Sequence, residues 1–370
     1  MMRFGLSALA LVTAVTAVPS PLVERQSPFQ ETAIADLNEP WALAFLPDER
    51  VLVTERAGTL RLVDPSTSST GEITGVPSVV YAGQGGLGDV AIHPNFEENN
   101  QVYISYVVSA DGGASNAVVA RGTLALNENG GGALEDLEVI WVQDPPISGS
   151  GHFSHRILFD SDGFMWISSG DRQQFDPAQD MSGNLGKILR LNDDGTVPEG
   201  NPFADEGGVA AQVWSLGVRN PLGIAFDAEG RLWEIEMGPQ GGDELNLIQE
   251  GGNYGWPEVS EGIHYDGEDI PNHSTRPEFI PPKVAWVPSI SPASVIVYKG
   301  DLFSDWTGNA LIAALGQQGV VRVELDGEDA TEAEKISMGR RIRTIREDPE
   351  GALWILEDGP GGRLVKLTPA

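Results

Sequence analysis

Apolar and polar residues alternate in short runs along most of the chain, and the runs come in pairs. In one clear pair, apolar positions at 222–226 lead into the turn Asp227–Gly230, and a second run follows at 231–233. A period of two predicts β-strands, and a Gly- or Asp-rich turn between two such runs predicts a hairpin. Three further clear copies begin at Trp41, His155 and Ile342, and weaker ones span 87–105 and 293–314.

These six hairpin units are spaced irregularly, by roughly 45 to 70 residues. A hairpin repeated at such intervals is typical of a propeller blade, so we predict an all-β fold, a six-bladed β-propeller. The irregular spacing implies long loops, which gather at one end of the ring and are expected to form a ligand site there. Helical periodicity is nearly absent, and the best candidate for a helix is the short polar segment 330–336.

The N-terminus has the pattern of a secretory signal. Arg3 precedes a short apolar stretch at 5–16, and Val15-Thr16-Ala17 offers a small-residue cleavage site. We therefore expect a signal peptide over 1–17, a linker over 18–30 and one propeller domain over 31–370. The protein is expected to be exported, to the periplasm or beyond. No other stretch approaches the ~18 apolar residues of a membrane helix.

Composition narrows the possible partners. The chain has 370 residues, 41% of them hydrophobic, and a formal net charge of −31. A chain of this length and composition can bury a large core, while so acidic a surface repels phosphate backbones and anionic lipids. We therefore expect neither nucleic-acid binding nor membrane insertion. The chain contains no cysteine, which excludes disulfides, thiolate metal sites and a covalently attached haem. Electrons that leave the protein must pass to an external acceptor.

Two motif matches are weak. The stretch Gly83–Gly88 fits the spacing of a dinucleotide-binding loop, but a strand-like run follows it where a helix is required, so a turn or an active-site loop is favoured. The Asp-Gly turns lack the flanking helices and the terminal Glu of an EF-hand, which favours hairpin turns.

A Gly-rich segment at 148–156 carries His152, His155 and Arg156 just before a predicted strand. Histidine is the natural base near neutral pH. Asp171 closes the hairpin that this strand opens, and a hairpin returns its end to its beginning. Asp171 is therefore expected to lie near His152 and to orient its imidazole. A solvated loop histidine remains the alternative.

Two other groups of residues are candidates for binding. Gly, Pro, Arg, Asn, Asp and Glu are interleaved over 217–223, 236–244 and 252–257, which suits either a hard-cation site built from carbonyls and a carboxylate or a set of polar turns. Arg341 and Arg343 point to the same face if they lie on a strand, and such a pair recognises carboxylates. A charged edge strand is the alternative for this pair.

From about Pro40 to its C-terminus, the chain resembles the soluble aldose dehydrogenases that depend on pyrroloquinoline quinone (PQQ), the glucose/sorbosone dehydrogenase family. The motifs that carry the resemblance occur in the family's order. They are Pro40-Trp41, Thr54-Glu55-Arg56, Gly83-Gln84, His152 with Arg156, Arg219-Asn220-Pro221, Gly238-Pro239, Gly242-Asp243-Glu244, Asn253-Tyr254-Gly255-Trp256-Pro257, Pro288-Ser289 and Arg341-Ile342-Arg343.

This resemblance implies a six-bladed propeller that oxidises aldoses at the anomeric carbon to lactones and passes electrons to an external acceptor. His152 matches the family's base, which takes the proton of the anomeric hydroxyl. Asp171 matches the acid that orients this base, and Gln84 matches a pocket residue beside the sugar.

The resemblance also implies two cofactors, PQQ and calcium. Arg219 and Asn220 match residues that hold the quinone and stabilise charge on its oxygens. Gly238 and Pro239 match the backbone carbonyls on the catalytic calcium, and Glu244 and Tyr254 match a second, structural calcium site. Contacts to the cofactor's carboxylates are implied for Ser289, Arg341 and Arg343.

The chain departs from the family at four places. Gly316-Gln317-Gln318 stands where a lysine usually lies near the cofactor, which removes one cationic contact. Met237 replaces a more polar residue, Val218 replaces a common histidine, and His155 stands where glycine is usual. Two other functions are open on the residues alone. One is a calcium-dependent propeller lactonase or other hydrolase, and the other is a non-catalytic extracellular binding propeller.

Overall fold

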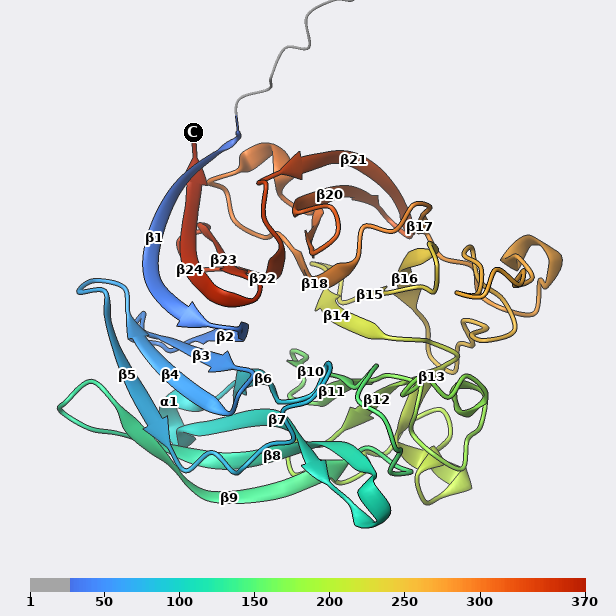
Figure 1. Cartoon of the computed structure of the whole chain (residues 1–370), viewed down its shortest axis with the longest axis horizontal. Helices are drawn as coiled ribbons and strands as arrows, with labels where there is room; N and C mark the ends of the chain where they lie inside the picture. Colours follow the sequence, from blue (N-terminus) through green and yellow to red (C-terminus); the bar gives the residue numbers. More distant parts are fainter. Residues whose placement is uncertain (1–26) are drawn as a thin grey trace, which may run out of the picture.

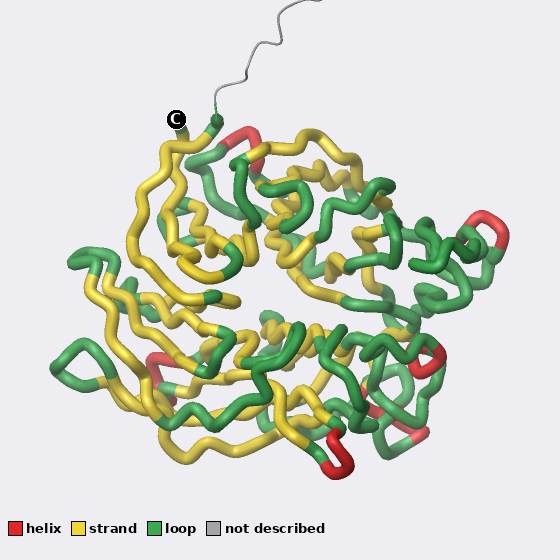
Figure 2. Tube along the Cα trace, in the orientation of Figure 1, coloured by secondary structure: helices red, strands yellow, loops and turns green. Residues whose placement is uncertain are grey.

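Strands dominate the computed structural model, which describes residues 27–370 (Figure 1). The predicted signal peptide and most of the predicted linker lie outside the described residues. The prediction of an all-β fold is confirmed. Helical structure is confined to single turns, seen as short red segments in Figure 2. They are α1 (Phe96–Asn99) and the 3-10 turns Asp111–Gly113, Asp176–Ala178, Ala204–Glu206, Ala210–Gln212, His273–Thr275 and Ser304–Trp306. Within 27–370, no helix has the length and apolar character needed to cross a membrane.

Four of the sheets have four strands each, in the following orders. One runs β10 (Ser154–Phe159), β11 (Met165–Ser169), β12 (Lys187–Leu191), β13 (Val213–Leu216). The next runs β14 (Pro221–Phe226), β15 (Leu232–Glu236), β16 (Asp243–Ile248), β17 (Val284–Trp286). A third runs β18 (Pro292–Val297), β19 (Ala310–Ala314), β20 (Gly319–Asp326), β21 (Asp329–Ser337). The last runs β22 (Ile342–Glu347), β23 (Leu353–Glu357), β24 (Pro360–Pro369) and β1 (Phe29–Asn38).

The remaining sheet has eight strands and contains two antiparallel meanders. One is β2 (Pro40–Phe45), β3 (Val51–Glu55), β4 (Thr59–Asp64), β5 (Ser69–Thr74), and the other is β6 (Leu87–Ile92), β7 (Gln101–Ser109), β8 (Ser115–Leu126), β9 (Gly132–Val142). A short parallel pairing of β5 with β9, at Ile73–Gly132 and Thr74–Ala133, joins the two meanders.

The sheets are arranged around a common centre, as Figure 1 shows. The first strand of each meander faces this centre. β2 packs against β6, β6 against β10, β10 against β14, β14 against β18, β18 against β22, and β22 against β2. The ring is completed by the N-terminal strand β1, which pairs antiparallel with the C-terminal strand β24 from Phe29–Pro369 to Asn38–Pro360. Both termini of the described chain therefore stabilise one sheet.

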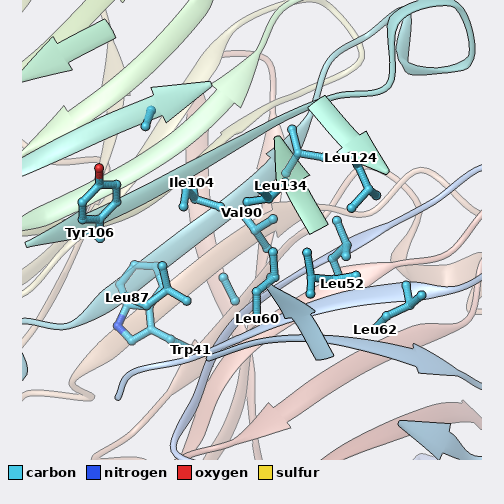
Figure 3. Close-up of a cluster of buried hydrophobic side chains, with 14 of the residues drawn as sticks. Trp41, Leu52, Leu60, Leu62, Leu87, Val90, Ile104, Tyr106, Leu124 and Leu134 are labelled. Carbon is cyan, nitrogen blue, oxygen red and sulfur yellow. The ribbon is translucent and has the colours of Figure 1, made fainter. Parts of the chain in front are cut away.

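Apolar side chains fill the interfaces between sheets. Figure 3 shows the cluster between the first two meanders, in which Trp41, Leu60, Leu87, Val90 and Ile104 are all buried. Because successive residues of a strand point to opposite faces, each inner strand presents one apolar set to each neighbouring sheet.

The segment 330–336, the best candidate for a helix in the sequence, is a strand. These residues lie in β21, which pairs antiparallel with β20, for example Val320 with Ile336. Most side chains of β21 are exposed, so its sequence carries little apolar periodicity of either kind. The exposed backbone edge of β20 supplies the hydrogen bonds that decide its conformation, and a segment this short and polar has little intrinsic tendency to remain helical.

A carboxylate stabilises the first hairpin turn in three of the sheets. Its Oδ1 accepts two backbone N–H groups of the turn, and its Oδ2 accepts the indole N–H of a tryptophan six residues further on. The pairs are Asp160–Trp166 at 2.8 Å, Asp227–Trp233 at 2.9 Å and Asp348–Trp354 at 2.8 Å. The Asp-Gly turns of the sequence are thus hairpin turns, as predicted.

Replacing Asp227 with alanine is expected to lower the free energy of unfolding by about 2–4 kcal/mol, because it leaves the fully buried indole N–H of Trp233 unpaired and removes two turn hydrogen bonds. Denaturant unfolding would measure the change. Asp48→Ala is the matched control: Asp48 lies in an equivalent turn and bonds Arg50, but its carboxylate bonds no tryptophan. Its expected cost is below about 1 kcal/mol, and equal losses would contradict the role given to the buried indole bond.

Candidate active site

His152 and Asp171 meet at one end of the ring. His152 precedes β10 and Asp171 follows β11, and the antiparallel pairing of these strands brings Ser154 opposite Ser169. The His152 Nδ1 lies 2.7 Å from Asp171 Oδ1, and both side chains are buried. The hairpin therefore places the acid beside the imidazole, as the sequence predicts.

Further hydrogen bonds hold the carboxylate and backbone of Asp171. Its Oδ2 accepts the indole N–H of Trp256 at 2.8 Å, its Oδ1 also accepts the Gln173 N–H at 2.8 Å, and its own N–H donates to the Arg219 carbonyl at 2.8 Å. A fixed carboxylate at Nδ1 favours the tautomer with the proton on Nδ1 and leaves Nε2 of His152 free to accept a proton. Burial lowers the pKa of His152 below 6.5, although Asp171 opposes the shift. The imidazole is therefore neutral at neutral pH and competent as a base.

Gln84 lies directly beside this pair. Its side-chain Oε1 accepts the backbone N–H of His152 at 2.7 Å, and its own N–H donates to the Ser150 carbonyl at 2.7 Å. Gly83 makes this approach possible, because a Cβ there would lie 2.3 Å from Ser150 Oγ and its φ is +57°. The glycine-rich stretch is thus a loop of the site, as the absence of a following helix predicts.

Arg219 and Asn220 come from the chain just before β14, and their backbone N–H groups both donate to Glu236 Oε2. The Arg219 Nη1 donates to the carbonyls of Met237 at 2.8 Å and Gly238 at 2.7 Å. The Asn220 Oδ1 accepts from Ser154 Oγ at 3.0 Å. Two buried donors of this pair, Arg219 Nε and Asn220 Nδ2, have no partner among the described residues. Unpaired buried donors are costly, so an acceptor bound next to them would stabilise the folded chain.

A cavity of about 430 Å³ adjoins these residues. It is lined by Gln84, His155, Asn220 and Met237 together with three arginines, Arg56, Arg341 and Arg343. Arg341 and Arg343 both bond Asp358, through Nε atoms 2.8 Å from its two carboxylate oxygens. The two guanidinium groups therefore share one face, and they bring positive charge to a strongly acidic protein.

Ser289 does not line the cavity itself, although its hydroxyl lies 3.2 Å from that of Ser291, which does. The Ser289 hydroxyl donates to Asp243 Oδ2 at 2.6 Å. The Asp243 carboxylate also accepts the N–H groups of Gly238, Ile290 and Ser291 at 2.8–3.0 Å. Asp243 thus ties the Gly238 loop to the loop that precedes β18.

Comparison with known proteins agrees with this geometry. The model of the glucose/sorbosone dehydrogenase family matches residues 37–366. The chain belongs to this family. It is 37% identical to the aldose sugar dehydrogenase YliI of Escherichia coli over 90% of this chain and 91% of the relative. It is 28% identical to quinoprotein glucose dehydrogenase B of Acinetobacter calcoaceticus, over 96% and 92% of the two chains.

Solved structures of family members superpose on the chain. The aldose sugar dehydrogenase of Escherichia coli in its apo form gives a TM-score of 0.86 at 36% identity, covering 92% of this chain and 100% of that one. The PQQ-bound aldose sugar dehydrogenase of Streptomyces coelicolor gives a TM-score of 0.75 at 27% identity, covering 93% and 99%. The prediction of a dehydrogenase of this family is confirmed.

The residues matched to calcium in this dehydrogenase lie around a buried acidic group. Glu234, Glu236 and Glu244 are buried, and Asn246 Nδ2 lies 3.1–3.5 Å from all three carboxylates. Burial raises the pKa of Glu236 to about 7 and raises the pKa of Glu244 and Glu234 well above 4.5. Such a group is stabilised either by protonation or by a cation.

The residues of the two predicted calcium sites lie around one small space rather than two. A small space is lined by Gly238, Pro239, Glu244 and Tyr254, which fits a single ion held by carbonyls and a carboxylate. The Gly238 carbonyl is bonded by Arg219, however, so Arg219 and a cation compete for it. The hydroxyl of Tyr254 donates to the Leu247 carbonyl at 2.6 Å, which leaves only the backbone of Tyr254 for a metal. Within 27–370, no group of three or more His, Cys, Asp or Glu side chains forms a metal site.

Two further residues lie at the site, although no sequence pattern gives them a role there. Arg56 lines the cavity and donates to the carbonyls of Gly83 and Gly85, and Trp256 holds Asp171. Both belong to motifs that carry the resemblance, but nothing local in the sequence shows which way they point.

Proposed function

We propose that the chain oxidises aldose sugars at the anomeric carbon to lactones, with PQQ and calcium as cofactors and an external electron acceptor. The observation that carries the proposal is a buried His–Asp pair beside a cavity with three arginines. The similarity to an aldose sugar dehydrogenase and to a PQQ-bound one supports the substrate class and the cofactor. We also propose that the eight-stranded sheet is two blades, which makes six in all, and that the protein is exported.

The chain's own residues would hold the sugar and move one proton. Nε2 of His152 takes the proton of the anomeric hydroxyl, and Asp171 stabilises the imidazolium that forms. Gln84, bonded to the His152 backbone, is positioned to form one wall of the sugar site. Bound PQQ would supply the two-electron oxidant that accepts the hydride from the anomeric carbon.

The cavity suits a planar tricarboxylate such as PQQ. Arg341, Arg343 and Arg56 line the cavity and can neutralise carboxylates, and Asn220, which also lines it, carries an unpaired amide donor. Calcium would be held by the carbonyls of Gly238 and Pro239 and by the carboxylate of Glu244, which line one small space together with Tyr254.

A reconstitution experiment tests the function. Apo-protein is loaded with PQQ in calcium, and the reduction of an artificial dye is followed with several aldoses. Turnover with at least one aldose, absent without PQQ, is the expected result. Binding of PQQ without turnover on any aldose would favour a binding propeller over an enzyme.

Arg343 in β22 and Arg341 just before this strand give a graded prediction. Arg343→Ala should weaken PQQ binding by about 10- to 100-fold, because a guanidinium–carboxylate bond contributes about 1.5–3 kcal/mol. Arg341→Ala should have a smaller effect, since its side chain is 50% exposed against 13% for Arg343. Calorimetric titration of PQQ into each variant measures the two affinities.

Arg340→Ala is the matched control for these variants. Arg340 is the preceding residue, but its guanidinium pairs with Glu31 and Glu357 and does not line the cavity. Its PQQ affinity should match the wild type. Equal affinities for all three variants would show that the cluster is only a charged edge of the sheet.

A further inference from the structure

His155 occupies an unusual position for its residue type. Its φ is +52°, in the left-handed region that suits glycine, and its neighbours His152 and Ser154 also have positive φ. A non-glycine residue persists there only when its surroundings hold it, and such strain clusters at functional sites. The side chain is 2% exposed, and yet it lines the cavity that also holds the three arginines.

The surroundings are shaped around the imidazole. Its ring stacks on Trp41 with centroids 5.3 Å apart and planes 7° from parallel. Gly88 provides the space, because a Cβ there would lie 1.9 Å from the ring carbon Cε1 of His155. The ring therefore has one position, fixed by Trp41 on one side and by the Gly88 backbone nearby.

Hydrogen bonding then decides which ring nitrogen carries the proton. Nδ1 lies 2.7 Å from Ser105 Oγ, and the same oxygen accepts the Asp89 N–H at 2.7 Å. Among the described residues, Nδ1 is the one acceptor for the Ser105 hydroxyl hydrogen. The hydroxyl thus donates to Nδ1, and the proton of the neutral ring lies on Nε2. Burial lowers the pKa of His155 to about 3, so the ring stays neutral at neutral pH.

With Nδ1 of His155 bonded to Ser105, the Nε2–H group of the same ring is a donor in a fixed position. It bonds no described residue, and it is not among the fully enclosed polar atoms that lack a partner. Because His155 lines the cavity, this donor is available to a ligand there. We infer that His155 is a cofactor-binding residue of this chain, whose Nε2–H donates a hydrogen bond to an anionic oxygen of the planar polycarboxylate in the cavity. This inference rests on the proposed function.

Calorimetric titration of PQQ into apo-protein in calcium tests the assignment without an activity assay. His155→Phe keeps a ring against Trp41 but has no donor, and it should lose about 10- to 100-fold in affinity. In His155→Gln the amide nitrogen reaches about as far as Nε2, so its affinity should stay within about threefold of the wild type. His155→Gly suits the left-handed backbone and should fold even if the phenylalanine variant does not, with the same loss.

The possible outcomes are separable. Wild-type affinity in the phenylalanine or glycine variant overturns the inference and leaves the proposed function intact. Equal loss in the glutamine and phenylalanine variants also overturns it, because the donor then contributes nothing. If the wild-type chain does not bind PQQ at all, the proposed function fails and the inference fails with it.

Discussion

His152→Ala is expected to lower kcat at least about a hundredfold while PQQ affinity stays close to that of the wild type. Loss of a general base typically costs about 10²–10⁴ in rate, because the proton of the substrate then has no positioned acceptor. The cofactor cavity is lined by other side chains, so its affinity for PQQ should survive. Steady-state kinetics at saturating PQQ and a separate titration measure the two quantities.

Asp171→Asn should fall between His152→Ala and the wild type. The amide can still bond Nδ1 but no longer stabilises the imidazolium or selects the tautomer that leaves Nε2 free. The pH profile gives an independent readout. The rate should rise with pH as His152 loses its proton and should reach its plateau with a midpoint below 6.5, because burial lowers its pKa.

His155→Gly tests which of the two histidines is the base. It should need more PQQ than the wild type because it loses the proposed donor, but it keeps His152 and should therefore reach a kcat near the wild-type value once PQQ is saturating. A dead His155→Gly variant beside an active His152→Ala variant would show that the two histidines have been assigned in the wrong order.

Removal of calcium is expected to abolish turnover, and adding calcium back should restore it. Gly238 and Pro239 offer hard carbonyl ligands, and the buried carboxylates of Glu236 and Glu244 lie beside the same small space. A cation there would compensate charges that are otherwise costly to bury. Chelation and dialysis, followed by the dye assay with and without calcium, measure the effect. Full activity of metal-free protein would remove calcium from the proposed mechanism.

Two variants sharpen the calcium experiment. Glu244→Gln replaces a buried carboxylate with an amide of similar shape, and it should raise the calcium concentration needed for half-maximal activity by about tenfold or more. Glu258→Gln is the control, because Glu258 pairs with Arg276 at the surface and should change nothing. The thermal midpoint of the wild type should rise with calcium concentration, since an ion that binds only the folded state stabilises it.

Local sequence was sufficient to predict the hairpins and the nearness of one functional pair, His152 and Asp171. Period-two alternation and Asp-Gly turns act over fewer than about ten residues, and strand pairing within a hairpin follows from them. The nearness of His152 and Asp171 is of this kind, because they stand at the two open ends of one hairpin. The all-β class follows in the same way, from the recurrence of such units.

Pairing between distant segments was decided only by the folded chain. The closure of the last sheet by β1 and the parallel contact of β5 with β9 join residues about 58 or more positions apart, and no local pattern encodes them. Segment 330–336 became a strand for the same reason, since the edge of β20 supplies the hydrogen bonds that its own sequence does not specify.

The cavity too is a tertiary property. Arg56 follows β3, His155 lies in β10 and Arg343 in β22, and they line one cavity because the inner strands of these sheets are arranged around one centre. In the sequence, His155 is recognised only as a histidine at a position where the family usually has glycine. Only packing against Trp41, Gly88 and Ser105 fixes the ring and its proton, because hydrogen bonding and close contact depend on distances that a linear sequence does not contain.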